Sequence, residues 1–299
     1  SHIFSRRNIE AAFGKNKMYV SNVLVTNSVK EAKKANVFPL FCREHDNDLF
    51  ESIENANHYN IDNLSDSFLY FYRLNAYDVY VKKCFNYLLS NGNKWTKKII
   101  RSSPQNYSLT SNFNLSSDMQ NLINDNSLKY FTGDLLSVKT FDLNKINCTP
   151  LFFRLTYKNV CQIIATTDNN RLYLMFYFNN QYNKREFDLF WGSLNLTDIS
   201  KLIKMMCVAA DVSIKSYTLY NRYVFLSYDY RALIYNSNTS SFIDYLQNLL
   251  KLAYMTINHL FAHEQQLNID YHCGVQNSKM MYLNEVYPGK IDNYRRHFG

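Results

Sequence analysis

The pattern of hydrophobic and polar positions predicts that the first third of the chain is mainly helical. In residues 66–89, apolar positions recur at spacings of three and four, and Asn91-Gly92 follows as a stop signal, so this segment is predicted to be a helix. Residues 28–35 contain helix formers and precede Pro39, which predicts a second, shorter helix. Residues 18–26 are predicted to be a strand.

The hydrophobic period changes in the second part of the chain. Residues 151–156, 160–167 and 171–178 are predicted strands, separated by short turn sequences. Helices are predicted at residues 186–194 and 197–210, with Thr197 as the N-cap of the second. Strand character returns at residues 216–220 and 223–228. A long amphipathic helix is then predicted to open near Thr239 or Ser240 and to continue to residue 261.

A polar segment separates these two parts. Residues 101–118 are rich in Ser and Asn and contain one Pro, which is typical of a loop or linker. We therefore predict an α+β protein with a mainly helical N-terminal region, residues 1–118, and a mixed strand and helix domain, residues 119–299.

The composition favours a globular protein inside a cell. Hydrophobic residues make up 46% and aromatic residues 16%, which excludes a disordered chain. No apolar run reaches the roughly 18 to 20 residues that a membrane span needs, and the first residues lack the apolar core of a secretory signal. The six cysteines are widely spaced without a CxxC pair, which predicts reduced, buried thiols. We expect a cytoplasmic or other intracellular location.

The bias in residue types suggests an origin and a kind of partner. The excess of Tyr, Phe, Asn, Lys and Ile is typical of an AT-rich genome, such as that of an insect virus or another AT-rich parasite, and of these we expect a viral protein in a host cell. Tyr-rich surfaces favour protein partners, although aromatic residues also fill cores. The net charge of +8 permits nucleic-acid contact without requiring it.

The order of predicted elements in residues 150–299 gives one resemblance. Strands, a helix, two strands and a long apolar helix lead into residues 269–282, which contain His272 and, five positions later, Asn277. This order resembles the protein-kinase fold, in particular divergent viral kinases of the poxvirus type. The resemblance implies that Asn277 and Asp292 stand at the metal-binding positions and His272 at the position of the catalytic Asp. It also makes Glu186 the candidate partner of the ATP-binding Lys.

The departures from the kinase pattern predict a protein without kinase activity. The catalytic position holds a His, the predicted strand at residues 172–178 has no Lys, and no glycine lies between Gly133 and Gly192. Phosphoryl transfer needs an Asp at the catalytic position, a Lys on that strand and a glycine loop over the phosphates. We therefore expect a non-catalytic, pseudokinase-like binding or scaffold protein with a protein partner and no cofactor. A long helix followed by a loop and a strand is also common in other α/β proteins.

A basic and aromatic segment supports an alternative function. Aromatic stacking combined with cationic phosphate contacts is how single-stranded nucleic acids are bound without sequence reading. The segment carries Phe85 and Tyr87, and its candidate binding residues are Lys82, Lys83, Lys94, Trp95, Lys97, Lys98 and Arg101. A solvated helix end would look similar, because lysine is favoured near helix C-termini.

Histidine and cysteine residues near the end of the chain allow a third hypothesis, an unrecognised enzyme. His259 and His263 are four apart on the predicted long helix and could hold zinc, but the order is not HExxH and helix-surface histidines are commoner. His272-Cys273 is similar to a phosphatase loop, yet Lys279 replaces the Arg that binds phosphate bidentately. We assign no catalytic residue and no metal ligand.

Overall fold

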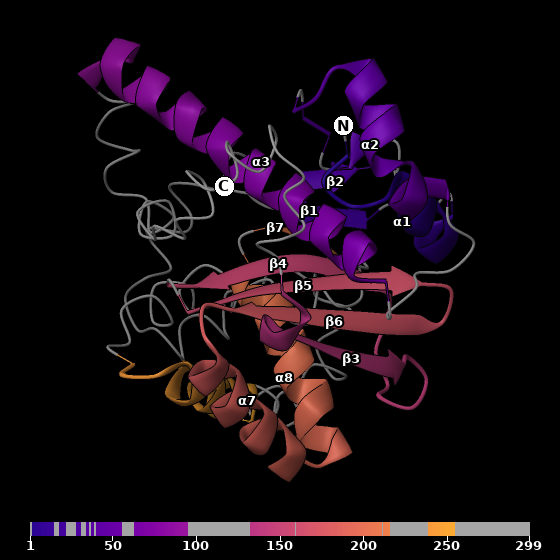
Figure 1. Cartoon of the computed structure of the whole chain (residues 1–299), viewed down its shortest axis with the longest axis vertical. Helices are drawn as coiled ribbons and strands as arrows, with labels where there is room; N and C mark the ends of the chain where they lie inside the picture. Colours follow the sequence, from indigo (N-terminus) through magenta and orange to yellow (C-terminus); the bar gives the residue numbers. More distant parts are fainter. Residues whose placement is uncertain are drawn as a thin grey trace, which may run out of the picture. The chain divides into compact units, whose positions relative to one another are not determined.

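The computed structural model describes slightly more than half of the chain (Figure 1). The described residues are 2–14, 18–21, 28–30, 34, 35, 37, 38, 40–55, 63–94, 132–158, 160–210, 212–215 and 239–254. The chain divides into two compact units, residues 1–250 and 251–299. Nearly all of the described residues belong to the first unit.

Seven strands of the first unit form one antiparallel sheet. In chain order these strands are β1 (Met18–Ser21), β2 (Ser28–Lys30), β3 (Leu136–Asp142), β4 (Leu151–Tyr157), β5 (Cys161–Asp168), β6 (Arg171–Phe178) and β7 (Val212–Lys215). Their order across the sheet is β2-β1-β7-β4-β5-β6-β3. Strands β4, β5 and β6 follow one another as neighbours, and β3 pairs with β6 from Leu136↔Tyr177 to Asp142↔Arg171.

Helices cover both faces of this sheet. The described helices are α1 (Arg6–Phe13), α2 (Arg43–Asn55), α3 (Leu64–Asn91), α7 (Gln181–Ser193) and α8 (Leu196–Ala209), and residues 242–254 are also helical. A single 3₁₀ turn, η3 (Gly133–Leu135), leads into β3. Figure 1 shows α3 on one side of strands β4 to β6 and α7 and α8 on the other. The fold is therefore α+β, as the sequence predicts.

Burial on both faces explains why the central strands are almost uniformly apolar. Every residue of β4 and β5 is buried, and β6 is buried at all positions after Arg171. On one face, Phe152 packs against Phe4 of the N-terminal segment, with ring centroids 5.8 Å apart. On the other face, Phe176 packs against Phe187 of α7, with ring centroids 4.4 Å apart. A sheet covered on both sides needs apolar residues at consecutive positions rather than alternation.

Short polar side chains set the helix starts. Asn180 is the N-cap of α7 and accepts a hydrogen bond from the backbone N–H of Asn183 at 2.8 Å. Asn195 caps α8 in the same way, through the N–H of Asp198 at 2.9 Å. The predicted N-cap Thr197 is therefore wrong, because Asn195 satisfies the free N–H groups first and Leu196 is already helical.

Most predicted elements are found, with three differences. The predicted strands at residues 151–156, 160–167 and 171–178 are confirmed, and so is a strand at the start of residues 18–26. The predicted helices at residues 66–89 and 197–210 are confirmed, and the helix at 239–261 is confirmed as far as residue 254.

The helix predicted at residues 28–35 is wrong, because Ser28–Lys30 pairs with β1 as strand β2. The helix predicted at 186–194 begins earlier, at Gln181. Helices α1 and α2 and strands β3 and β7 were not predicted. The predicted strands at 216–228 and the linker with its boundary at residue 118 lie outside the described residues.

The described part of the chain contains five cysteines, and none of the five forms a disulfide. Cys161 and Cys207 are buried as predicted, whereas Cys42 is exposed. Burial raises the pKa of the Cys148 thiol to about 12, although nearby Lys204 lowers it. None of the helices in the described part of the chain is long and apolar enough to cross a lipid bilayer.

Candidate functional site

The structure describes only some of the residues that the sequence singles out. Lys83 on α3 and Lys94, just beyond its end, are both exposed, and Glu186 lies exposed on α7. Lys82 belongs to α3, but its side chain is outside the description. The other candidates also lie outside the described residues: Trp95, Lys97, Lys98, Arg101, His259, His263, His272, Cys273, Asn277, Lys279 and Asp292. Their predicted roles stay predictions.

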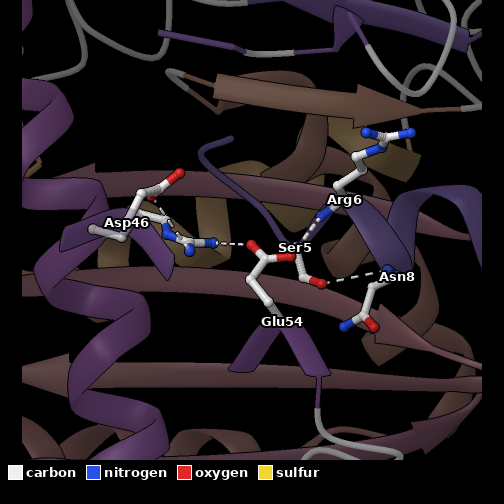
Figure 2. A network of polar contacts seen from close by, with 6 residues as sticks. Ser5, Arg6, Asn8, Asp46 and Glu54 are labelled. Atoms are coloured by element: carbon white, nitrogen blue, oxygen red, sulfur yellow. Dashed lines mark hydrogen bonds and ion pairs between the residues drawn. The ribbon is translucent and has the colours of Figure 1, made fainter. Parts of the chain in front are cut away.

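The first half of α3 is buried and anchored by Arg73. The guanidinium of Arg73 lies 2.5 Å from Glu54 and 4.0 Å from Asp46, both on α2, and 4.0 Å from the centroid of the Phe50 ring. The same Glu54 carboxylate accepts a hydrogen bond of 3.2 Å from the backbone N–H of Arg6 on α1 (Figure 2). Glu54 therefore joins three helices, α1, α2 and α3.

A second buried polar contact joins α3 to the sheet. The side chains of Asn75 and Gln162 exchange hydrogen bonds of 2.8 and 3.3 Å, and both residues are buried. Two amides that satisfy each other in this way fix the rotation of the helix about its axis, because any turn would leave a buried donor and acceptor unpaired. Because α3 is one continuous helix, this contact in its first half also sets which residues of its second half face away from the sheet.

The second half of α3 presents an exposed aromatic ring beside a lysine. Tyr87 is 67% exposed, and Lys83, one helical turn before it, is exposed on the same face. Lys94 follows the Gly92 cap at the end of the helix and is also exposed. We refer to Lys83, Tyr87 and Lys94 as the α3 basic face.

The stretch of sequence that contains these residues carries charge of one sign only. No Asp or Glu occurs between residues 79 and 117, whereas this stretch holds six Lys and Arg residues. An uninterrupted positive stretch attracts an anionic ligand because no carboxylate in the same segment competes for the ammonium groups. A ring that is two-thirds exposed can stack against a planar group, and the ammonium groups can bind phosphate oxygens.

A different ion pair anchors α7 to the edge of the sheet. Asp188 accepts hydrogen bonds from Ser137 at 2.9 Å and Lys139 at 2.9 Å, both on β3, and from Lys184 at 3.0 Å on its own helix. Burial raises the pKa of this carboxyl, but the three donors outweigh burial and the pKa is lowered. The α7 carboxylate that bonds to a strand lysine is thus Asp188, while Glu186 points to solvent.

The outward side of α7 carries exposed apolar residues that the sequence analysis did not select. Tyr182 is 71% exposed and Leu189 is 66% exposed, with the exposed residues Arg185 and Glu186 between them. Large apolar side chains on a helix surface mark interaction sites when they gather on one face. The spacing of seven residues was visible in the sequence, but it equally fits a face that packs on a core.

Neither a metal site in the described residues nor a known protein indicates the function. The described residues contain no group of three or more His, Cys, Asp or Glu side chains that could hold a metal ion. Comparison of the chain with family models, curated proteins and solved structures gives no match. The exposed residues of α3 and α7 are the candidate functional surfaces of the described chain.

Proposed function

We propose that the protein is a non-catalytic binding protein that holds single-stranded nucleic acid on the α3 basic face. The observation that carries this proposal is the exposure of Tyr87 one turn from Lys83, in a part of α3, residues 79–91, without acidic residues. A base can stack on the tyrosine ring while neighbouring phosphates meet Lys83 and Lys94. In a duplex the bases already stack on each other, so the ring favours a single strand.

The anchoring of α3 supports this proposal energetically. Binding costs free energy when the protein must first order the groups that make contact. The contacts of Arg73 with Glu54 and of Asn75 with Gln162 hold the first half of α3 in place, and the second half continues the same helix. The positions of Lys83 and Tyr87 are therefore set before a ligand arrives.

Fluorescence anisotropy with a labelled oligothymidine tests the proposal. Replacing Tyr87 by Ala removes the stacking surface and should weaken binding about tenfold, because stacking on one aromatic side chain contributes on the order of 1–3 kcal/mol per base. Tyr87→Phe keeps the ring and should bind as the wild type does. Equal affinities of the wild type and Tyr87→Ala would contradict the proposal, as would tighter binding of a duplex.

We also propose a protein partner as a second role, favoured by the exposed Tyr182 and Leu189 on α7. This role agrees with a scaffold built on a degenerate kinase-like domain in residues 150–299, which the order of residues 269–282 supports. An intracellular and viral setting belongs to the same proposal. The free thiols of the five described cysteines and the AT-rich bias of the residue types support it.

A further inference from the structure

A second tyrosine lies on the same side of α3 as Tyr87. Tyr80 comes three residues before Lys83 and seven before Tyr87, and positions three, four and seven apart share one face of a helix. Two helical turns separate the two tyrosines, which is a rise of about 10 Å along the axis. An aromatic, a basic and a second aromatic side chain therefore follow one another along α3.

The ring of Tyr80 is supported from the protein side. Its centroid lies 6.0 Å from that of Phe38, and the side chain packs partly against the hydrophobic core. The rest of the side chain is accessible to solvent. Hydrogen bonding with Cys84 raises the pKa of the Tyr80 hydroxyl, so the ring carries no charge at neutral pH that would repel a phosphate. An aromatic surface that is already ordered binds a base at a lower entropic cost.

The separation of the two rings matches a strand of several nucleotides. One base stacks on one ring, so a single nucleotide covers either Tyr80 or Tyr87 but not both. Neighbouring nucleotides of a stacked strand are about 3.4 Å apart, and those of an extended strand are further apart. A rise of about 10 Å therefore corresponds to about two or three nucleotide steps. The backbone that links the two bases passes Lys83, whose ammonium group attracts its phosphates.

We propose that the α3 basic face binds an oligonucleotide lengthwise, with one base on Tyr87, a second base on Tyr80 and a phosphate between them on Lys83. This inference rests on the proposed nucleic-acid binding. It deepens that function because it adds Tyr80 to the binding residues and names an oligonucleotide, not a mononucleotide, as the preferred ligand. The strand then follows the axis of the helix.

Fluorescence anisotropy with a labelled oligothymidine of about eight nucleotides tests the role of Tyr80. Tyr80→Leu and Tyr80→Met remove the ring but keep an apolar side chain next to Phe38, and Leu and Met are good helix formers. Both variants should weaken binding about fivefold or more, because the stacking of one base is lost. Tyr80→Phe restores the ring and should retain tight binding. Tyr182→Leu removes an exposed tyrosine on the opposite side of the sheet (Figure 1) and should leave the affinity unchanged.

Thymidine monophosphate as an unlabelled competitor tests the lengthwise arrangement in the same assay. Its inhibition constant should change little in Tyr80→Leu, because a single nucleotide still stacks on Tyr87. An equal loss of affinity for the mononucleotide and the oligonucleotide would overturn the arrangement. Full oligonucleotide affinity in Tyr80→Leu and Tyr80→Met, with weaker binding by Tyr87→Ala, would overturn the role of Tyr80 and leave the proposed function standing. Unchanged affinity in Tyr87→Ala, or no binding by the wild type, would contradict the proposed function and this inference with it.

Discussion

Asn75 on α3 and Gln162 on β5 exchange two side-chain hydrogen bonds in the buried layer between the helix and the sheet. The residues are 87 positions apart in the chain, yet each amide is the other's partner. This pair fixes how α3 is rotated on the sheet, and so it determines which residues of its second half face outward.

Replacing Asn75 by Leu should lower the free energy of unfolding by about 1–3 kcal/mol, because the amide of Gln162 stays buried without its partner. Adding Gln162→Leu removes the orphaned amide, so the double variant should be more stable than the sum of the single losses implies. Urea unfolding of the four proteins measures this coupling. Additive losses would show that the pair contributes nothing as a pair.

Arg73 and Glu54 should respond unequally to substitution. Glu54→Ala leaves the buried guanidinium of Arg73 without its nearest carboxylate, which costs about 3–5 kcal/mol when a buried pair is broken. Arg73→Met removes the buried charge itself and leaves Glu54, whose side chain is 26% exposed, in contact with water. Chemical denaturation should therefore show the larger loss for Glu54→Ala. The reverse order would contradict this account of the network.

The stability should depend on Asp188 as the pH falls. The pKa of its carboxyl is lowered from the ordinary value of 3.8, so the charged form stabilises the folded state above that value. This stabilisation is lost as the pH falls through the folded-state pKa. Asp188→Asn should be less stable than the wild type at neutral pH, and the difference in Tm should shrink as the pH falls below the ordinary carboxyl value of 3.8. A difference that stays constant over this range would show that the ion pairs to Lys139 and Lys184 contribute nothing.

ATP with Mg²⁺ should not raise the Tm of the protein. Strand β6 supplies no lysine, and no glycine lies between Gly133 and Gly192 to form a loop over the phosphates. A ligand that binds only the folded state raises the Tm with its concentration. A rise that grows with the ATP concentration would contradict the non-catalytic proposal and favour a working nucleotide site.

The elements that could be predicted from sequence are those with a strong local signal. Strand β6 matches its predicted range because an apolar run lies between two turns. Residues 28–30 form a strand and not the predicted helix, because pairing with β1 overrides the helix propensity of the segment 28–35. The start of α7 was missed because its first turn is polar, and only the cap at Asn180 marks it.

Residues of the candidate sites can also be predicted from sequence only where the signal is local. Lys83 and Tyr87 could be selected from sequence because basic and aromatic residues are neighbours there. The ion pair of Lys139 with Asp188 could not, because its members come from separate elements 49 residues apart. On α7, the sequence does not say whether Tyr182 and Leu189 or Phe187 and Trp191 face the sheet. That choice follows only once the strands that the helix covers are known.

The salt dependence of oligothymidine binding tests the central claim most directly. A plot of log affinity against log salt concentration has a slope of about −0.7 for each phosphate neutralised on a single strand. The variant Lys83→Gln/Lys94→Gln should therefore reduce the magnitude of the slope by about 1.4, which is two times 0.7. A control, Lys145→Gln, changes an exposed lysine in the turn after β3 and should leave the slope unchanged. Equal slopes for the wild type and the double variant would contradict nucleic-acid binding on the α3 basic face.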